Sequence, residues 1–221
     1  MKKRYRDILQ DIAETQQPDP KTRSLCFVAT ASSLNNMAAA ESVIRFTLRQ
    51  ERASYAELYE AVLQTYLFAG FPAALEGLSV LYKCMPNNTI ESLPMPYSLE
   101  EYRHRGEQLC QSIYTNVYEK MRAKLGRISP DLDHWMIIEG YGKTLSRPGI
   151  STKTRELISA CSLAAMGWEN QCYSHIRGAL NVGASPAECR GLLPIVKSLV
   201  SQHRYKNAVR IFDIVLEGSL S

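Results

Sequence analysis

The sequence TRELISACSLAAMGWENQCYSHIRGALNVG, from Thr154 to Gly183, indicates the fold. We expect it to form two helices, 152–166 and 169–182, because apolar residues recur at spacings of three and four and a Gly-Trp turn separates the two runs. The same spacing runs through nearly every other segment of the chain, and strict alternation of apolar and polar residues is absent. We therefore predict an all-α protein.

The stretch has a degenerate twin in the first half of the chain. Laid without gaps on Thr154–Val182, the segment Thr22–Gln50 is identical at seven of 29 positions, where chance would give about two for ordinary composition. The identical pairs are Thr22/Thr154, Arg23/Arg155, Leu25/Leu157, Ser42/Ser174, Ile44/Ile176, Arg45/Arg177 and Leu48/Leu180. This pattern predicts an internal duplication, and hence a duplicated helical bundle.

The chain divides at a proline-rich stretch. We predict a first, degenerate repeat over 1–83, a linker over 84–98, and a second repeat over 99–221. The helices expected from periodicity and capping signals span 2–15, 22–34, 37–50, 54–69, 72–83, 99–125, 131–143, 152–166, 169–182, 186–201 and 204–217. Two capping boxes, Ser98–Glu101 and Ser185–Glu188, mark helix starts.

Composition restricts the class of function. The formal charge of +4 is spread along the chain apart from a short basic cluster near the N-terminus, so we expect no nucleic-acid partner. No apolar run is long enough for a membrane span and no signal peptide is recognisable, which predicts a cytoplasmic protein with no membrane partner. The six cysteines form no CxxC pair or metal-type cluster, so we expect free thiols and neither metal nor cofactor.

The second half carries, in this order, the motifs Tyr141-Gly142, Ser146–Ile150, Thr154–Leu157, His175–Gly183 and Ser185–Glu188. Through these motifs it resembles the carboxymuconolactone decarboxylase family, whose fold also includes the alkylhydroperoxidase D-like group. The first half is similar to the segment that follows the histidine helix in the family, through Ser54–Glu57, Glu60–Leu63 and Gly70–Ala74. The resemblance implies an all-α fold of the alkylhydroperoxidase D-like type and a homo-oligomer, for which the apolar segment Leu58–Phe68 would suit an interface.

The candidate catalytic residues lie in the second half only. Glu156 precedes His175 by nineteen residues, which would place both side chains at similar height on two antiparallel helices; Ser24 and Val43 stand at the equivalent positions of the first half. An imidazole can donate a proton near neutral pH, and a carboxylate can orient it. Together with this chemistry, the resemblance implies that Glu156 and His175 form the acid/base pair of a carboxy-lyase or related enzyme acting on a small lactone or carboxylic acid.

Three further residues are predicted to bind the substrate. Arg147 would hold its carboxylate, Tyr141 could donate a hydrogen bond, and Trp168 could form one wall of the pocket. Arg155 and Arg177 are expected to be structural instead, because their twins persist in the half that lacks the Glu/His pair.

Two other readings remain open. In the peroxide-reducing branch of the fold, two cysteines lie four and seven residues before the histidine, where this chain has Gln171 and Trp168. A thiol-dependent peroxidase would then depend on Cys172 or Cys161 acting alone. For each of these cysteines we expect instead the role of a small, buried hydrophobic side chain. The other reading is a non-catalytic scaffold in which the Glu/His pair is structural.

Overall fold

The computed structural model describes residues 17–85 and 98–218, and every regular element in these ranges is a helix. The prediction of an all-α protein is therefore confirmed. The expected helix 2–15 and most of the expected linker lie outside the described residues. The described part of the first half contains α2 (Pro20–Ser33), α3 (Met37–Arg49), α4 (Tyr55–Leu63) and α5 (Tyr66–Cys84).

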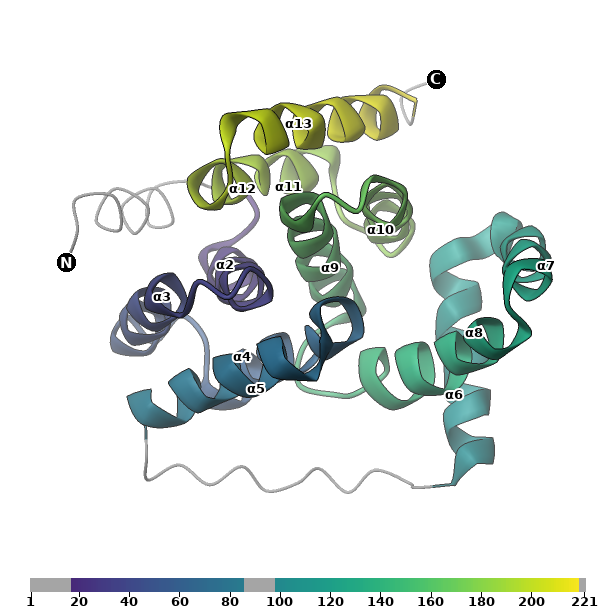
Figure 1. Cartoon of the computed structure of the whole chain (residues 1–221), viewed down its shortest axis with the longest axis horizontal. Coiled ribbons are helices and arrows are strands. Elements are labelled where there is room, and N and C mark those ends of the chain that lie inside the picture. Colours follow the sequence, from purple (N-terminus) through teal and green to yellow (C-terminus); the bar gives the residue numbers. More distant parts are fainter. Residues whose placement is uncertain (1–16, 86–97, 219–221) are drawn as a thin grey trace.

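Figure 1 shows the second half as a teal group of helices at the right of the view and a green to yellow group at the centre and top. Its elements are α6 (Leu99–Tyr114), the short 3-10 turn η1 (Thr115–Val117), α7 (Tyr118–Ile128), α8 (Pro130–Trp135), the π-helix η2 (Met136–Leu145), α9 (Thr152–Met166), α10 (Glu169–Asn181), α11 (Pro186–Arg190), α12 (Leu193–Leu199) and α13 (Gln202–Glu217).

Helices α2 and α9 pack against each other at the centre of the molecule. Both are buried around nearly their whole circumference, as expected for helices with no polar face. They touch through Thr30 and Ser162, whose hydroxyl oxygens lie 3.2 Å apart. These two residues are equivalent in the alignment of the halves, and equivalent residues meet each other where an approximate twofold axis passes between two copies. The contact supports the predicted duplication, which remains a prediction.

One hydrophobic core joins the two halves. It contains apolar residues of α2 to α5 together with those of α9 to α13. Leu58, Ala61 and Val62 belong to this core and are fully buried, so these residues of the segment expected at an oligomer interface cannot provide one. A second, smaller cluster lies between α6 and η2 and includes Cys110, Ile113 and Tyr141.

Several predicted boundaries need correction. The helix expected over 99–125 is broken at Thr115, whose φ of 48° is incompatible with helix. The helix expected over 131–143 starts as a short α-helix and continues as a π-helix. The helix expected over 186–201 is interrupted between α11 and α12. The kink at Gly70, with φ 81° and ψ 167°, lies in the gap predicted between 54–69 and 72–83.

The π-helix is held against α6 by two glycines. A Cβ atom at Gly106 would lie 2.1 Å from the carbonyl oxygen of Ile137, and one at Gly142 would lie 1.9 Å from that of Tyr102. Only glycine allows the two backbones to approach this closely. This contact fixes η2 as one wall of the cavity described next.

Candidate functional site

Glu156 and His175 meet as the sequence predicts. Gly167, at φ 84°, ends α9 in the left-handed conformation, and the chain turns back into α10 so that the two helices pack side by side. Nδ1 of His175 lies 2.8 Å from Oε2 of Glu156, and both side chains are buried. Because a carboxylate oxygen can only accept, Nδ1 carries the hydrogen, and Nε2 is the nitrogen left for proton exchange.

Gly178 makes room for this carboxylate, a role that sequence analysis missed. A Cβ atom at Gly178 would lie 2.5 Å from Oε2 of Glu156 and 2.8 Å from a methyl group of Ile113. The alignment of the two halves could have indicated this role. Gly178 is aligned with the much larger Phe46 of the first half, which has no Glu/His pair and so needs no space for a carboxylate. The second carboxylate oxygen, Oε1, is buried with no hydrogen-bond partner among the described residues.

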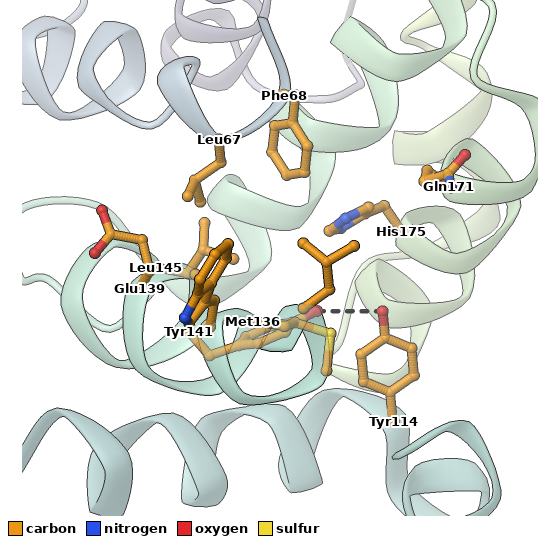
Figure 2. Close-up of a pocket in the computed structure, with 12 residues that line it drawn as sticks. Leu67, Phe68, Tyr114, Met136, Glu139, Tyr141, Leu145, Gln171 and His175 are labelled. Atoms are coloured by element: carbon orange, nitrogen blue, oxygen red, sulfur yellow. Dashed lines mark hydrogen bonds between the residues drawn. The ribbon is translucent and has the colours of Figure 1, made fainter. Parts of the chain in front are cut away.

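His175 forms part of the wall of a cavity of about 370 Å³. The cavity lies between α5, α6, α8, η2 and α10, and Figure 2 shows the imidazole beside the rings and aliphatic chains that line it. Its lining residues are Leu67, Phe68, Tyr114, Leu132, Trp135, Met136, Glu139, Gly140, Tyr141, Leu145, Gln171 and His175. Most are apolar, and none of these twelve described residues is a lysine or arginine. A cavity of this size and character suits a small, largely apolar ligand.

The first half contributes Phe68, whose ring meets the His175 imidazole edge to face at a centroid distance of 5.2 Å. This contact fixes the plane of the imidazole. The sequence does not predict Phe68 at the site, because a local sequence pattern does not indicate which helix of the first half packs on a given residue of the second.

Tyr141 lines the cavity, as expected of a substrate-binding residue, but its hydroxyl is already engaged. It donates to the hydroxyl oxygen of Tyr114 at 3.2 Å.

On the same π-helix, Glu139 accepts from Tyr66 at 2.8 Å and from Lys143 at 2.9 Å. Burial opposes ionisation of Glu139, but these two hydrogen bonds outweigh it and lower its pKa. The cavity wall therefore includes one carboxylate that stays charged at neutral pH.

Arg147 lies elsewhere than predicted. Its guanidinium holds both oxygens of Glu60 at 2.8–3.1 Å and is not among the residues that line the cavity. Glu60 also accepts from the buried Arg155 at 2.8 Å, and Arg155 bonds Gln64 as well. The hydrogen bond to Glu60 raises the pKa of Arg147. Burial lowers the pKa of Arg155, although its own hydrogen bond to Glu60 acts in the opposite direction. The network fastens α9 to α4, which is the structural role expected for Arg155.

Trp168 and the two candidate redox cysteines also lie off the cavity. The Trp168 side chain is 57% exposed in the turn between α9 and α10. Cys172 and Cys161 are buried in the core, and the Cys172 thiol contacts the carbonyl oxygen of Ala160 at 3.7 Å. Burial raises the pKa of Cys161 to about 12 and that of Cys172 further. Both thiols are therefore protonated and shielded at neutral pH, which removes the thiolate that attack on peroxide requires.

Gln171 occupies the position, four residues before His175, that the redox branch gives to a cysteine, and it does line the cavity. An amide at that position offers hydrogen bonds but no redox chemistry. In the described ranges, no three His, Cys, Asp or Glu side chains gather in a way that could hold a metal ion. Over the same ranges, no helix has the length and apolar character needed to cross a membrane.

Comparison with known proteins agrees with the resemblance found in the sequence. Residues 130–213 match the model of the carboxymuconolactone decarboxylase family, a segment that runs from α8 into α13 and includes Glu156 and His175. The chain is also 25% identical over 155 residues to Peroxisomal protein 2 of Saccharomyces cerevisiae. That match covers 58% of this chain and 55% of the yeast protein, so the chain spans about half the length of this relative.

Proposed function

We propose, on the premise that residues 130–213 are a carboxymuconolactone decarboxylase family segment, that the cavity is an active site in which His175 delivers a proton to carbon. The observation that carries the proposal is the position of the imidazole. It is hydrogen-bonded through Nδ1 to the buried Glu156 and lines an apolar cavity large enough for a small substrate. A nitrogen held in this way can exchange a proton with a bound molecule, because Glu156 fixes the orientation of the ring through Nδ1 and leaves Nε2 for the exchange.

The reaction class we propose is decarboxylation of a small lactone acid. The bond between the substrate carbon and its carboxylate breaks, carbon dioxide leaves, and the electron pair stays behind, delocalised into the conjugated lactone carbonyl as an enolate. Nε2 of the imidazolium then gives its proton to carbon, and solvent restores that proton. The walls favour the first step, because a carboxylate is poorly solvated among apolar side chains and its charge disperses as carbon dioxide departs.

No lysine or arginine is among the described residues that line the cavity, so this mechanism has no fixed cation to bind the substrate carboxylate. The sequence assigned that role to Arg147, whose guanidinium is bound to Glu60 instead. We therefore assign no carboxylate-binding arginine. Thiol-dependent peroxide reduction gains no support from the site, since the buried Cys161 and Cys172 have raised pKa values and lie outside the cavity lining.

The experiment is the rate of carbon dioxide release from γ-carboxymuconolactone and related lactone acids. We expect turnover by the wild type and at least a hundredfold loss in His175→Gln, the scale on which acid–base residues act. His203→Gln, an exposed histidine on α13, is the matched control and should keep the wild-type rate. Equal rates in wild type and His175→Gln would exclude the proposed role, and absence of turnover with every lactone acid would favour the scaffold reading.

Location and assembly remain predictions from sequence. A cytoplasmic homo-oligomer was expected, and the name of the yeast relative makes a peroxisomal location the alternative. Imaging of a fluorescent fusion and a mass measurement in solution would test the two expectations separately.

A further inference from the structure

The hydroxyl of Tyr114 is an unused hydrogen-bond donor in the cavity wall. Tyr114 is the last residue of α6, where the chain leaves the helix at Thr115. Its ring packs edge to face on Tyr141 at a centroid distance of 6.1 Å, and Tyr141 donates its single hydroxyl hydrogen to the Tyr114 oxygen. Tyr114 therefore accepts in this pair, and no described residue accepts its own hydrogen.

That hydrogen is available at neutral pH. Burial raises the pKa of Tyr114 well above the ordinary tyrosine value, so the hydroxyl stays protonated. An unpaired donor in an apolar wall is costly, and a ligand that supplies an acceptor removes the cost. Two other neutral donors of the lining, the Trp135 indole N–H and the Gln171 amide, also have no hydrogen-bond partner among the described residues, but both side chains are exposed to solvent and gain less from such a bond.

We propose that Tyr114 binds the carbonyl oxygen of the ligand, and that the cavity accordingly takes small, largely apolar carbonyl compounds such as lactones, esters or ketones. The assignment rests on the proposed function in one respect, that the cavity is the substrate site. It deepens that function, because a donor at the carbonyl oxygen also stabilises the enolate that decarboxylation leaves. In this arrangement Tyr141 is a positioning residue, since its hydroxyl fixes the Tyr114 oxygen and thereby turns the Tyr114 hydrogen away from the pair.

The test uses binding of two probes of nearly the same shape, acetophenone and ethylbenzene, which differ by the carbonyl oxygen. Dissociation constants are measured by NMR titration for the wild type, Tyr114→Phe and Tyr118→Phe. Tyr118 is the matched control, because its hydroxyl bonds Arg122 and it is not among the cavity-lining residues. The infrared carbonyl band of bound acetophenone gives a second readout that does not depend on affinity.

We expect Tyr114→Phe to weaken acetophenone binding about tenfold, the scale of one buried hydrogen bond, and to leave ethylbenzene binding unchanged. Tyr118→Phe should alter neither probe. In the wild type the carbonyl band should lie at lower frequency than in Tyr114→Phe. An equal loss for both probes, an unchanged acetophenone affinity, or no binding of either probe would overturn the assignment. Tyr114-dependent binding without His175-dependent turnover would leave this inference standing and remove the proposed reaction.

Discussion

Substituting Gly178 by alanine tests the geometry of the site directly. The added Cβ atom would lie 2.5 Å from Oε2 of Glu156, the oxygen that bonds His175. An ordinary contact begins at 3.4 Å, which is about 0.9 Å more. If the carboxylate recedes from Nδ1 by that amount, their distance grows from 2.8 Å to about 3.7 Å, where a hydrogen bond is lost.

The magnitude follows from two opposing contributions. Either the overpacking persists or the charged hydrogen bond breaks, and each route costs about 2 kcal/mol of unfolding free energy. Alanine regains about 1 kcal/mol through its higher helix propensity. Gly178→Ala should therefore be destabilised by about 1 kcal/mol.

Gly126→Ala is the matched control. Gly126 lies inside α7, and the nearest atom to its added Cβ is 4.0 Å away. This variant should gain about 1 kcal/mol, so the two differ by about 2 kcal/mol.

Urea unfolding measures the difference, and the ¹⁵N NMR resonances of His175 report whether its Nδ1–H bond survives. Equal stability of the two alanine variants, together with unshifted His175 resonances in Gly178→Ala, would refute the reasoning that Gly178 makes room for Glu156.

Three further predictions concern the scaffold. Glu60→Gln should lower the unfolding free energy by about 3–5 kcal/mol in urea titrations, because it leaves the guanidinium groups of Arg147 and Arg155 partly buried without a counter-charge; a loss within 1 kcal/mol would contradict the assigned network. Stability should fall as pH rises from about 9 toward 12, since the raised pKa of the buried Cys161 means that only the unfolded chain releases its thiol proton; the slope is about 1.4 kcal/mol per pH unit for each such thiol, and unfolding free energies that stay flat up to pH 10.5 would refute it. Alkylation at neutral pH followed by peptide mass mapping should label Cys84 first, because it is the one of the six described cysteines that is not buried; faster labelling of any other thiol would revive the redox reading.

The helices around the site were predictable because their signals are local. For α9 the predicted range 152–166 is the observed one, since Ser151 caps its first turn and Gly167 ends it. The break at Thr115 and the change to a π-helix at Met136 were missed. Neither Thr115 nor Met136 is a proline or glycine, so the residues at these two positions carry no local signal of a break or of a change of helix type.

The Glu156–His175 contact was predictable because a turn between two helices fixes which residues face each other. Arg147 shows the limit of the same reasoning. Its charge suggested a ligand for the substrate carboxylate, but Glu60, 87 residues earlier in the chain, takes that guanidinium in the folded protein. Tyr114 and Phe68 were missed for the same reason, since the cavity assembles residues from helices far apart in the sequence.

The most direct test of the central claim, that His175 delivers a proton to carbon inside the cavity, is the stereochemistry of turnover in D₂O. The account predicts one deuterium at the carbon that gains the proton, delivered to a single face by the wild type, with His175→Gln losing both the rate and the facial selectivity. Deuterium distributed equally over both faces in the wild-type product would show that protonation takes place in bulk solvent, and would contradict the claim.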